Sequence, residues 1–224
     1  LVLALCLTVL PAAAASGSMQ TVYLDSAEEF AAFAKNCSLD TWSQGKTFIL
    51  RADISLSGVD FTPAASFGGT FEGRGHTISD FNLTQNASPA GLFGTILPGG
   101  RVANLNVAGS VAAGGDKIAC GGIAGENLGR IQNCAVGSGG AAVTLTTRSR
   151  TAAGAVCAVN HKGGTVSGAE IGDRVTISGS AFLLGALVGD NSGTVADAKV
   201  AQQPEYDVSA SALQVGGAVG INRP

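Results

Sequence analysis

Residues 121–127 read Gly-Gly-Ile-Ala-Gly-Glu-Asn, and this stretch recurs along the chain. It returns as Gly-Ala-Val-Cys-Ala-Val-Asn at 154–160, Gly-Ala-Leu-Val-Gly-Asp-Asn at 185–191 and Gly-Gly-Ala-Val-Gly-Ile-Asn at 216–222. Successive copies begin 33, 31 and 31 residues apart. A looser copy, Ala-Gly-Leu-Phe-Gly-Thr-Ile at 90–96, begins 31 residues before the first. The chain is therefore an internal repeat, and repeats of this length indicate stacked architectures.

Each copy continues in the same way. A Gly is followed by Arg or Thr and then by a β-branched residue: Val102, Ile131, Val166 and Val195. Five positions later comes another: Val107, Val136, Ile171 and Val200. A third β-like piece follows at 143–146, at 175–177 and, more weakly, at 208–213. Each unit is thus predicted to hold roughly three short strands, separated by the Gly, Asn, Ser and Asp residues that favour turns.

Strands this short favour a solenoid in which each strand pairs with its equivalent one coil away. Coils about 4.8 Å apart place equivalent side chains over one another, and small residues let the coils approach closely. The 33 Gly residues and the aromatic content of only 5% agree with such a narrow interior. We therefore predict an all-β parallel β-helix of roughly 31-residue coils. A flexible linker is excluded because the glycines alternate with aliphatic pairs, and no Walker or Rossmann spacing supports a phosphate loop.

Four asparagines end the four motif copies: Asn127, Asn160, Asn191 and Asn222. In a stack, their amides could form a ladder, because each amide donates through its NH2 and accepts through its carbonyl. The same residues could instead cap isolated turns, and both interpretations stay open. A second column is predicted at Asn104 and Asn133, which Gly168 interrupts and Asp197 ends.

The segment before the repeats contains a predicted helix. Ser26 and Glu29 form a capping box, and Phe30, Phe33 and Ala34 make an apolar stripe at helical spacing. An open solenoid end exposes strand edges, so we expect this helix to cap the array. The expected organisation is an N-terminal cap of helix plus strand at 20–60 and solenoid coils at 61–224. The chain stops just after a motif copy, which predicts further coils or another domain.

Residues 1–16 resemble a secretory signal peptide. An apolar run at 1–10 is followed by Pro11 and an Ala-rich stretch at 12–15. The initiating Met and a basic start are absent, so we expect this end to be truncated; the alternative is a buried N-terminal strand or helix. The apolar run is too short to cross a bilayer, so no membrane span is expected in the mature chain. A net charge of −3 without a basic run argues against nucleic acid as a partner.

Residues 91–94, Gly-Leu-Phe-Gly, and their degenerate followers resemble the GLUG repeat of large exported bacterial surface proteins. That family includes some adhesins and the non-catalytic part of immunoglobulin A1 proteases. Residues 71–81 are similar to the segment that commonly precedes such repeats, so the resemblance covers about residues 22–222. It implies a right-handed parallel β-helix and export, and Cys157 and Ala158 depart from the motif. The repeat glycines are Gly91, Gly94, Gly122, Gly125, Gly185, Gly189, Gly217 and Gly220.

Catalytic signatures are scarce. The two histidines, His76 and His161, form no His-Glu-x-x-His motif, so no zinc protease site of that type is predicted. Lyases and glycosidases that use parallel β-helices need clustered carboxylates, but Glu126 and Asp190 are separated in their column by Val159. Other acidic and basic residues are expected in solvated turns: Asp173, Arg174, Glu205 and Asp207. No catalytic residue, cofactor or metal ligand is therefore assigned.

Four cysteines remain after the predicted leader: Cys37, Cys120, Cys134 and Cys157. An even count in an exported chain permits two disulfides in three connectivities. Their positions in the repeat differ, and buried free thiols packed as small apolar groups are the alternative.

The sequence thus predicts a non-catalytic, secreted or cell-surface β-solenoid segment that acts as a stalk or as an adhesive, protein-binding surface. The expected partner is a host or cell-surface protein or a glycan. Besides phenylalanine, the aromatic residues are only Trp42, Tyr23 and Tyr206. This scarcity disfavours a site in which sugar rings stack on aromatic side chains. The alternative function is a carbohydrate-active β-helix enzyme, either a polysaccharide lyase or a glycoside hydrolase.

Overall fold

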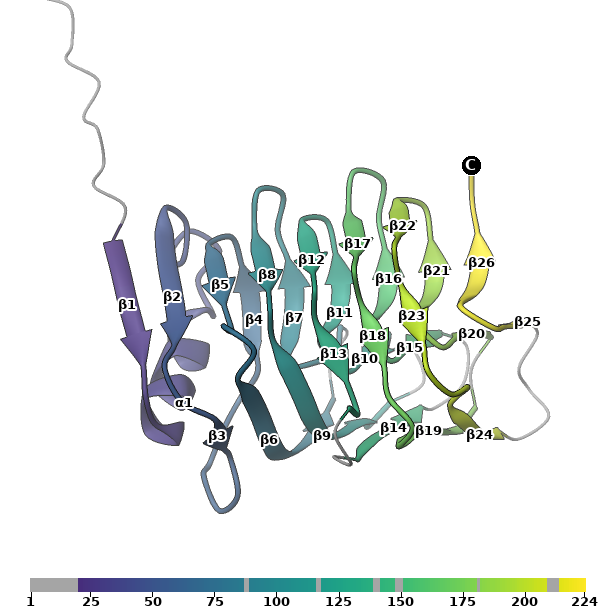
Figure 1. Ribbon diagram of the computed structural model, residues 1–224, viewed down its shortest axis with the longest axis horizontal. Helices are drawn as coiled ribbons and strands as arrows, with labels where there is room; N and C mark the ends of the chain where they lie inside the picture. The colour runs from purple at the N-terminus through teal and green to yellow at the C-terminus, as the bar shows by residue number, and fades with distance from the viewer. Residues whose placement is uncertain are drawn as a thin grey trace, which may run out of the picture.

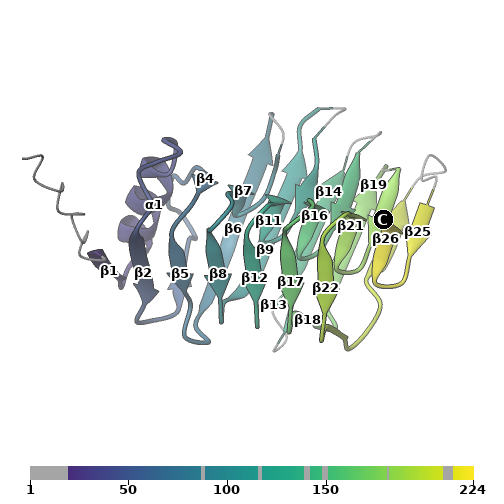
Figure 2. The ribbon, with the colours of Figure 1, turned by 90° about the horizontal axis from the view of Figure 1, so that it is seen from above.

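The computed structural model describes residues 20–86, 89–115, 118–138, 142–147, 151–180, 182–208 and 214–224. In these residues the chain forms a parallel β-solenoid whose coils follow one another along the long axis (Figure 1). A short helix lies at the N-terminal end (Figure 2). The predicted all-β solenoid and its N-terminal helix are confirmed. The predicted signal peptide at 1–16 falls outside the described residues.

The strands of the described residues form four sheets, here named S1 to S4. S1 contains β1 (Gln20–Leu24), β2 (Lys46–Leu50), β5 (Thr70–Glu72), β8 (Arg101–Ala103), β12 (Arg130–Gln132), β17 (Thr165–Ser167) and β22 (Thr194–Ala196). S3 contains β4 (Ala64–Phe67), β7 (Phe93–Ile96), β11 (Ala124–Asn127), β16 (Cys157–Asn160), β21 (Val188–Asn191) and β26 (Val219–Asn222). S4 contains β10 (Cys120–Gly121), β15 (Ala152–Gly154), β20 (Leu183–Gly185) and β25 (Gln214–Gly216).

S2 is the sheet on which the candidate site lies. It begins with β3 (Ile54–Ser55), β6 (Thr77–Gln85) and β9 (Asn106–Ala113). In later coils, a loop divides each equivalent of β9 into two strands: β13 (Ala135–Val136) and β14 (Val143–Thr147), β18 (Glu170–Ile171) and β19 (Val175–Gly179), β23 (Lys199–Val200) and β24 (Glu205–Val208).

The pairing is parallel and follows the repeat. Asn127 pairs with Asn160, Asn160 with Asn191, and Asn191 with Asn222, so the register equals the motif spacing. Stacking also extends into the segment expected to form the cap, because β1 and β2 are the first strands of S1.

Each coil has more strands than the three expected. The Gly-rich motif does not form one strand, because a corner divides it between β10 in S4 and β11 in S3. A Cβ at Gly121 would lie 2.0 Å from the carbonyl oxygen of Ala124, so only Gly allows so tight a corner. Of the weak strand expected at 208–213, only Val208 lies among the described residues, where it ends β24 (Glu205–Val208). Tyr206 of β24 lies in the inward column of Ile177.

Helix α1 (Ala27–Asn36) begins as predicted at Ser26, whose Oγ accepts a hydrogen bond from the backbone N–H of Glu29 (3.3 Å). The second hydrogen bond of the capping box differs from the prediction, which expects the Glu29 carboxylate to accept from the N–H of Ser26. The Glu29 carboxylate accepts from the N–H of Asp25 (2.7 Å), one residue before the cap. Phe30, Phe33 and Ala34 are buried against the first coils. The helix therefore buries its apolar stripe in the solenoid interior.

The interior changes along the axis. Phenylalanines fill the N-terminal coils, where Phe33 of α1 lies 4.6 Å from Phe48 and 5.4 Å from Phe71 between ring centroids. Later coils are filled by Val, Ile, Leu and Ala. Within the described residues, no helix is long and apolar enough to cross a membrane.

Candidate binding face

The S2 strands β6, β9, β14, β19 and β24 lie along the lower edge of the view in Figure 1, and they carry two outward columns of side chains. Side chains alternate along a strand, so the residues on either side of a buried one face outward. The first column contains Asn82, Ser110, Thr144, Thr176 and Glu205. The second contains Thr84, Ala112, Thr146, Ser178 and Asp207. We call these two columns the S2 face.

Hydroxyl and amide groups of the S2 face bond from coil to coil. The Oγ of Ser110 donates to the Oδ1 of Asn82 (2.8 Å), and the hydroxyls of Thr146 and Ser178 lie 3.3 Å apart. Because the inward neighbours Val111, Leu145 and Ile177 are fully buried, the strands are held firmly from beneath. The S2 face is therefore a regular polar surface on a rigid support.

A polar groove of about 590 Å³ opens at one end of this face. It is lined by Ala142, Asp173, Arg174, Val175, Thr176, Gln202, Gln203 and Glu205. We call it the S2 groove. Thr176 and Glu205 also belong to the first outward column, so the groove and the face are continuous.

The S2 groove follows from unequal loop lengths between the divided strands. The loop between β13 and β14 spans residues 137–142, and the loop between β23 and β24 spans 201–204. Between them, the loop from β18 to β19 has only residues 172–174. In the part of the chain that the structure describes, the short loop 172–174 contributes Asp173 and Arg174 to the groove, and the longer loop 201–204 contributes Gln202 and Gln203.

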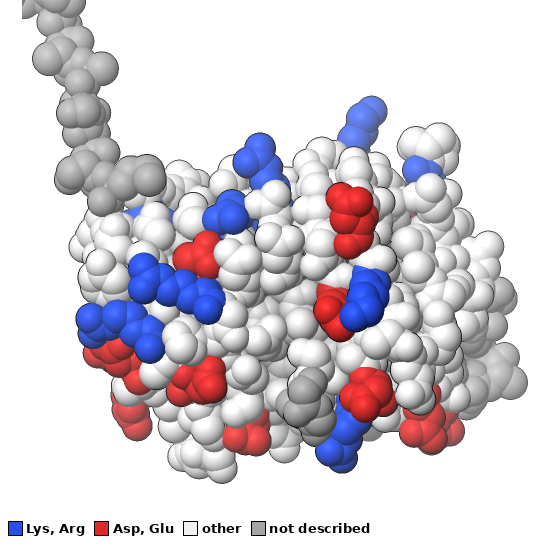
Figure 3. Space-filling model, viewed as in Figure 1, with Lys and Arg blue, Asp and Glu red and all other residues white. Residues whose placement is uncertain are grey.

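The groove lining includes both charge signs, with carboxylates from Asp173 and Glu205 and the guanidinium of Arg174. Glu205 and Asp207 were expected in a turn, but they lie on β24, because Tyr206 between them takes the inward position. Charges of both signs are also scattered over the face drawn in Figure 3. Among the described residues, no three His, Cys, Asp or Glu side chains form a metal-binding group.

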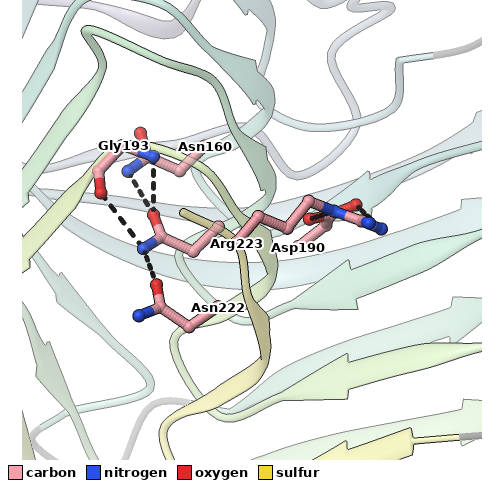
Figure 4. A network of polar contacts seen from close by, with 6 residues as sticks. Asn160, Asp190, Gly193, Asn222 and Arg223 are labelled. Carbon is pink, nitrogen blue, oxygen red and sulfur yellow. Dashed lines mark hydrogen bonds and ion pairs between the residues drawn. The ribbon is translucent and has the colours of Figure 1, made fainter.

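The asparagine column lies inside the solenoid. The Nδ2 of Asn127 donates to the Oδ1 of Asn160 (2.8 Å). In the same way, the Nδ2 of Asn160 donates to the Oδ1 of Asn191 (2.7 Å), and the Nδ2 of Asn191 donates to the Oδ1 of Asn222 (2.6 Å). Figure 4 shows the last of these contacts beside the ion pair of Arg223 with Asp190. Asn127 and Asn160 are fully buried. Asn127, Asn160 and Asn191 are buried, hold coils together and are not accessible to a ligand, whereas Asn222 at the end of the ladder is exposed.

The residues of the second predicted column share a left-handed backbone conformation. Asn104, Asn133, Gly168 and Asp197 all have φ between 51° and 61°. Left-handed backbone favours Gly, Asn and Asp, so one turn geometry explains all three residue types.

Each of the two histidines contacts a carboxylate. The Nδ1 of His76 lies 3.1 Å from Asp53, and the Nε2 of His161 lies 3.1 Å from Glu126. The backbone N–H of Thr77 and the ring of His76 lower the pKa of Asp53. Val159 separates Glu126 from Asp190 in the register, as predicted.

The four cysteines of the described residues are buried free thiols. Burial raises the pKa of Cys37 and Cys120 to about 12 and that of Cys134 to about 11, and it raises the pKa of Cys157 further. Of the two alternatives left open by the sequence, the structure has the packed thiols.

Most of the repeat glycines lie where coils or corners approach closely. A Cβ would come within 3.0 Å of neighbouring atoms at Gly91, Gly94, Gly122, Gly125, Gly185, Gly189 and Gly220. At Gly217, a Cβ would meet only Gln203, at an ordinary contact distance. The motif glycines therefore have a packing role.

Sequence reasoning missed the S2 groove. The outward columns of S2 follow from the repeat, but the hollow depends on a difference between consecutive loops. The motif spacing gives no signal for it, because the coils that carry the loops 172–174 and 201–204 are both 31 residues long.

No family model matches the chain, and no curated protein matches it. Among solved structures, the chain is similar to a Bacteroides ovatus protein named "putative immunoglobulin A1 protease". The TM-score is 0.52 and the identity 16%, over 88% of this chain and 83% of that chain. At this identity, the likeness supports a shared fold and assigns no activity.

Proposed function

We propose that this chain is a non-catalytic segment of an exported bacterial surface protein, a GLUG-like solenoid that serves as a stalk and presents the S2 face for adhesion. The observation that carries the proposal is the polar column from Asn82 to Glu205, which repeats at the same outward position in successive coils. A rigid stack keeps these groups in fixed rows, and fixed rows favour multivalent contact with a repetitive partner.

Two further features support the proposal. The apolar run at 1–10, followed by Ala-rich residues 12–15, resembles a secretory leader and favours a location outside the cell. Buried rows of Val, Ile and Leu beneath the S2 face favour a stiff spacer. The expected partner is a host or cell-surface protein or a glycan.

The adhesive role is tested with beads coated with the purified chain. Glutamates at Thr144 and Thr176 place two charges on the S2 face in adjacent coils, and we expect beads with T144E/T176E to lose most adhesion to host cells. The matched control is T165E/T194E, because Thr165 and Thr194 pair in the same way on S1. Equal adhesion by both variants would contradict the proposal.

The location is tested separately with antibodies raised against the purified chain. They should label intact cells of the bacterium that produces it. Labelling that requires permeabilised cells would contradict export.

A second candidate function is a carbohydrate-active enzyme, because Asp173 and Glu205 line one groove. Glycosidases need two carboxylates about 5 to 9.5 Å apart. We expect no release of reducing ends when the chain is incubated with polysaccharides. Turnover that disappears in both Asp173→Asn and Glu205→Gln would replace the non-catalytic proposal with this one.

A further inference from the structure

We propose that the S2 groove binds a neutral, hydroxyl-rich polysaccharide, which continues from the groove over the hydroxyl rows of β19 and β14. This inference names the ligand class for the proposed adhesive face, and it rests on that function.

The charges of the S2 groove disfavour charged ligands. An anionic polymer would meet the carboxylates of Asp173 and Glu205, and a cationic one would meet the guanidinium of Arg174. Ala142 is the exposed apolar side chain of the lining, whereas the side chain of Val175 packs in the core. Peptide recognition usually depends on buried aromatic or aliphatic anchors, and this groove offers little room for them. A neutral polar ligand therefore fits the lining best.

The remaining lining groups suit a ligand whose groups both donate and accept. Carboxylates only accept, a guanidinium only donates, and the amides of Gln202 and Gln203 do both. A sugar hydroxyl can satisfy each of these, since it donates one hydrogen bond and accepts two. A polyol can thus hydrogen-bond to the carboxylates of Asp173 and Glu205 and to the amides of Gln202 and Gln203 without bringing a charge of its own.

The size of the groove suits one or a few sugar units, and the continuity of the groove with the outward column favours a polymer over a single small molecule. A volume of about 590 Å³ lies within the range of small-ligand sites, roughly 300 to 1,000 Å³. Thr176 lines the groove and stacks on Thr144 in the previous coil, which stacks on Ser110. A chain that leaves the groove along this column meets another hydroxyl at each coil, about every 4.8 Å.

The test measures binding of the purified chain to soluble polymers by affinity electrophoresis and calorimetry. The neutral probes are a glucan, a mannan and a galactan, and the comparators are polygalacturonate, polylysine and gelatin. We expect at least one neutral probe to bind at least tenfold more tightly than every comparator. The variant Q203A/E205A should lose at least tenfold of this affinity, and Thr176→Val about threefold.

The matched control is D40A/D60A, because both residues are exposed and lie near the opposite end of the solenoid. It should bind as the unchanged chain does, and circular dichroism should show all variants folded. The inference is overturned if no neutral probe binds, if a charged polymer or gelatin binds most tightly, or if Q203A/E205A binds normally. Bead adhesion that T144E/T176E abolishes, without polysaccharide binding, would leave the adhesive proposal standing and remove only this inference.

Discussion

At the scale of single residues, the asparagine ladder shows how one interior position can be apolar in some coils and polar in others. Asn127 pairs in register with Ile96, and Ile96 with Phe67, so the column is apolar before the ladder begins. A buried amide is costly unless its groups are paired. The first amide oxygen of the ladder is satisfied locally, because the N–H of Gly129 donates to Asn127 (3.2 Å). The ladder therefore stabilises the stack as a connected row.

Asn160→Ala should cost about 2 to 3 kcal/mol of the free energy of unfolding. The change removes the acceptor of Asn127 and the donor to Asn191, and a buried polar group left unpaired costs about 1 to 3 kcal/mol. Urea denaturation measures the loss. The control is Asn222→Ala, at an exposed position with one bond to Asn191, which should cost under about 1 kcal/mol. Equal losses would show that burial does not matter to the ladder.

Asn133 tests the column of left-handed turns. Its φ is 51°, and a residue with a Cβ but no local side-chain bonding pays roughly 1 to 2 kcal/mol there. Asn133→Ala should therefore lower thermal stability, whereas Asn133→Gly should leave it nearly unchanged. A larger loss for Gly than for Ala would mean that the side chain of Asn133 matters more than its backbone.

The buried thiols make stability depend on alkaline pH. Unfolded cysteines ionise near pH 8.5, while Cys120 and Cys134 stay protonated to about pH 12 and about pH 11 in the folded chain. Their contribution is complete below pH 8.5 and is lost as the pH rises toward the folded pKa values. The free energy of unfolding should fall between pH 9 and pH 11 in urea titrations. In the variant C120A/C134A, the free energy of unfolding should fall less steeply with rising pH. An unchanged slope would contradict the raised pKa values of these two thiols.

At the scale of elements, α1 is anchored by its aromatic residues. Phe33 contacts the rings of Phe48, Phe67 and Phe71, with centroids 4.6 to 5.8 Å away. Phe33→Ala should cost about 3 to 5 kcal/mol in denaturant unfolding, because the cavity would lie at the centre of this cluster. Lys35→Gln on the exposed side of the helix should change stability by less than about 0.5 kcal/mol. Comparable losses for both would mean that α1 is not packed as described.

The elements also show how far the repeat pattern predicts the structure. Motif spacing predicts which residues pair, because equivalent positions in a solenoid must lie over one another. It does not predict the corner at Gly121, since a tight turn depends on three-dimensional approach to Ala124. Nor does it predict β24, whose position depends on Tyr206 replacing Ile177 in the inward column. The S2 groove was missed for a related reason, because it arises from a difference between loops rather than from their common pattern.

At the scale of the whole molecule, the interior changes from large to small side chains along the axis. In the inward column of S1, Phe71, Val102, Ile131 and Val166 are fully buried, whereas Val195 is only half-buried. Val215 of β25 is 56% exposed. In a repeat array, each coil is stabilised mainly by its neighbours, so local stability follows local packing.

Amide hydrogen exchange of the purified chain should therefore be slowest in β5, β8 and β12 and fastest in β22 to β26. Phe33→Ala should speed exchange in the N-terminal coils, because its cavity lies there, and should leave β26 unchanged. This pattern separates a nearest-neighbour array from a single cooperative unit, in which the mutation would speed exchange equally in every slowly exchanging strand. If exchange accelerates equally in all of these strands, the coils unfold together. The stability of the S2 face would then depend on the distant aromatic cluster around Phe33.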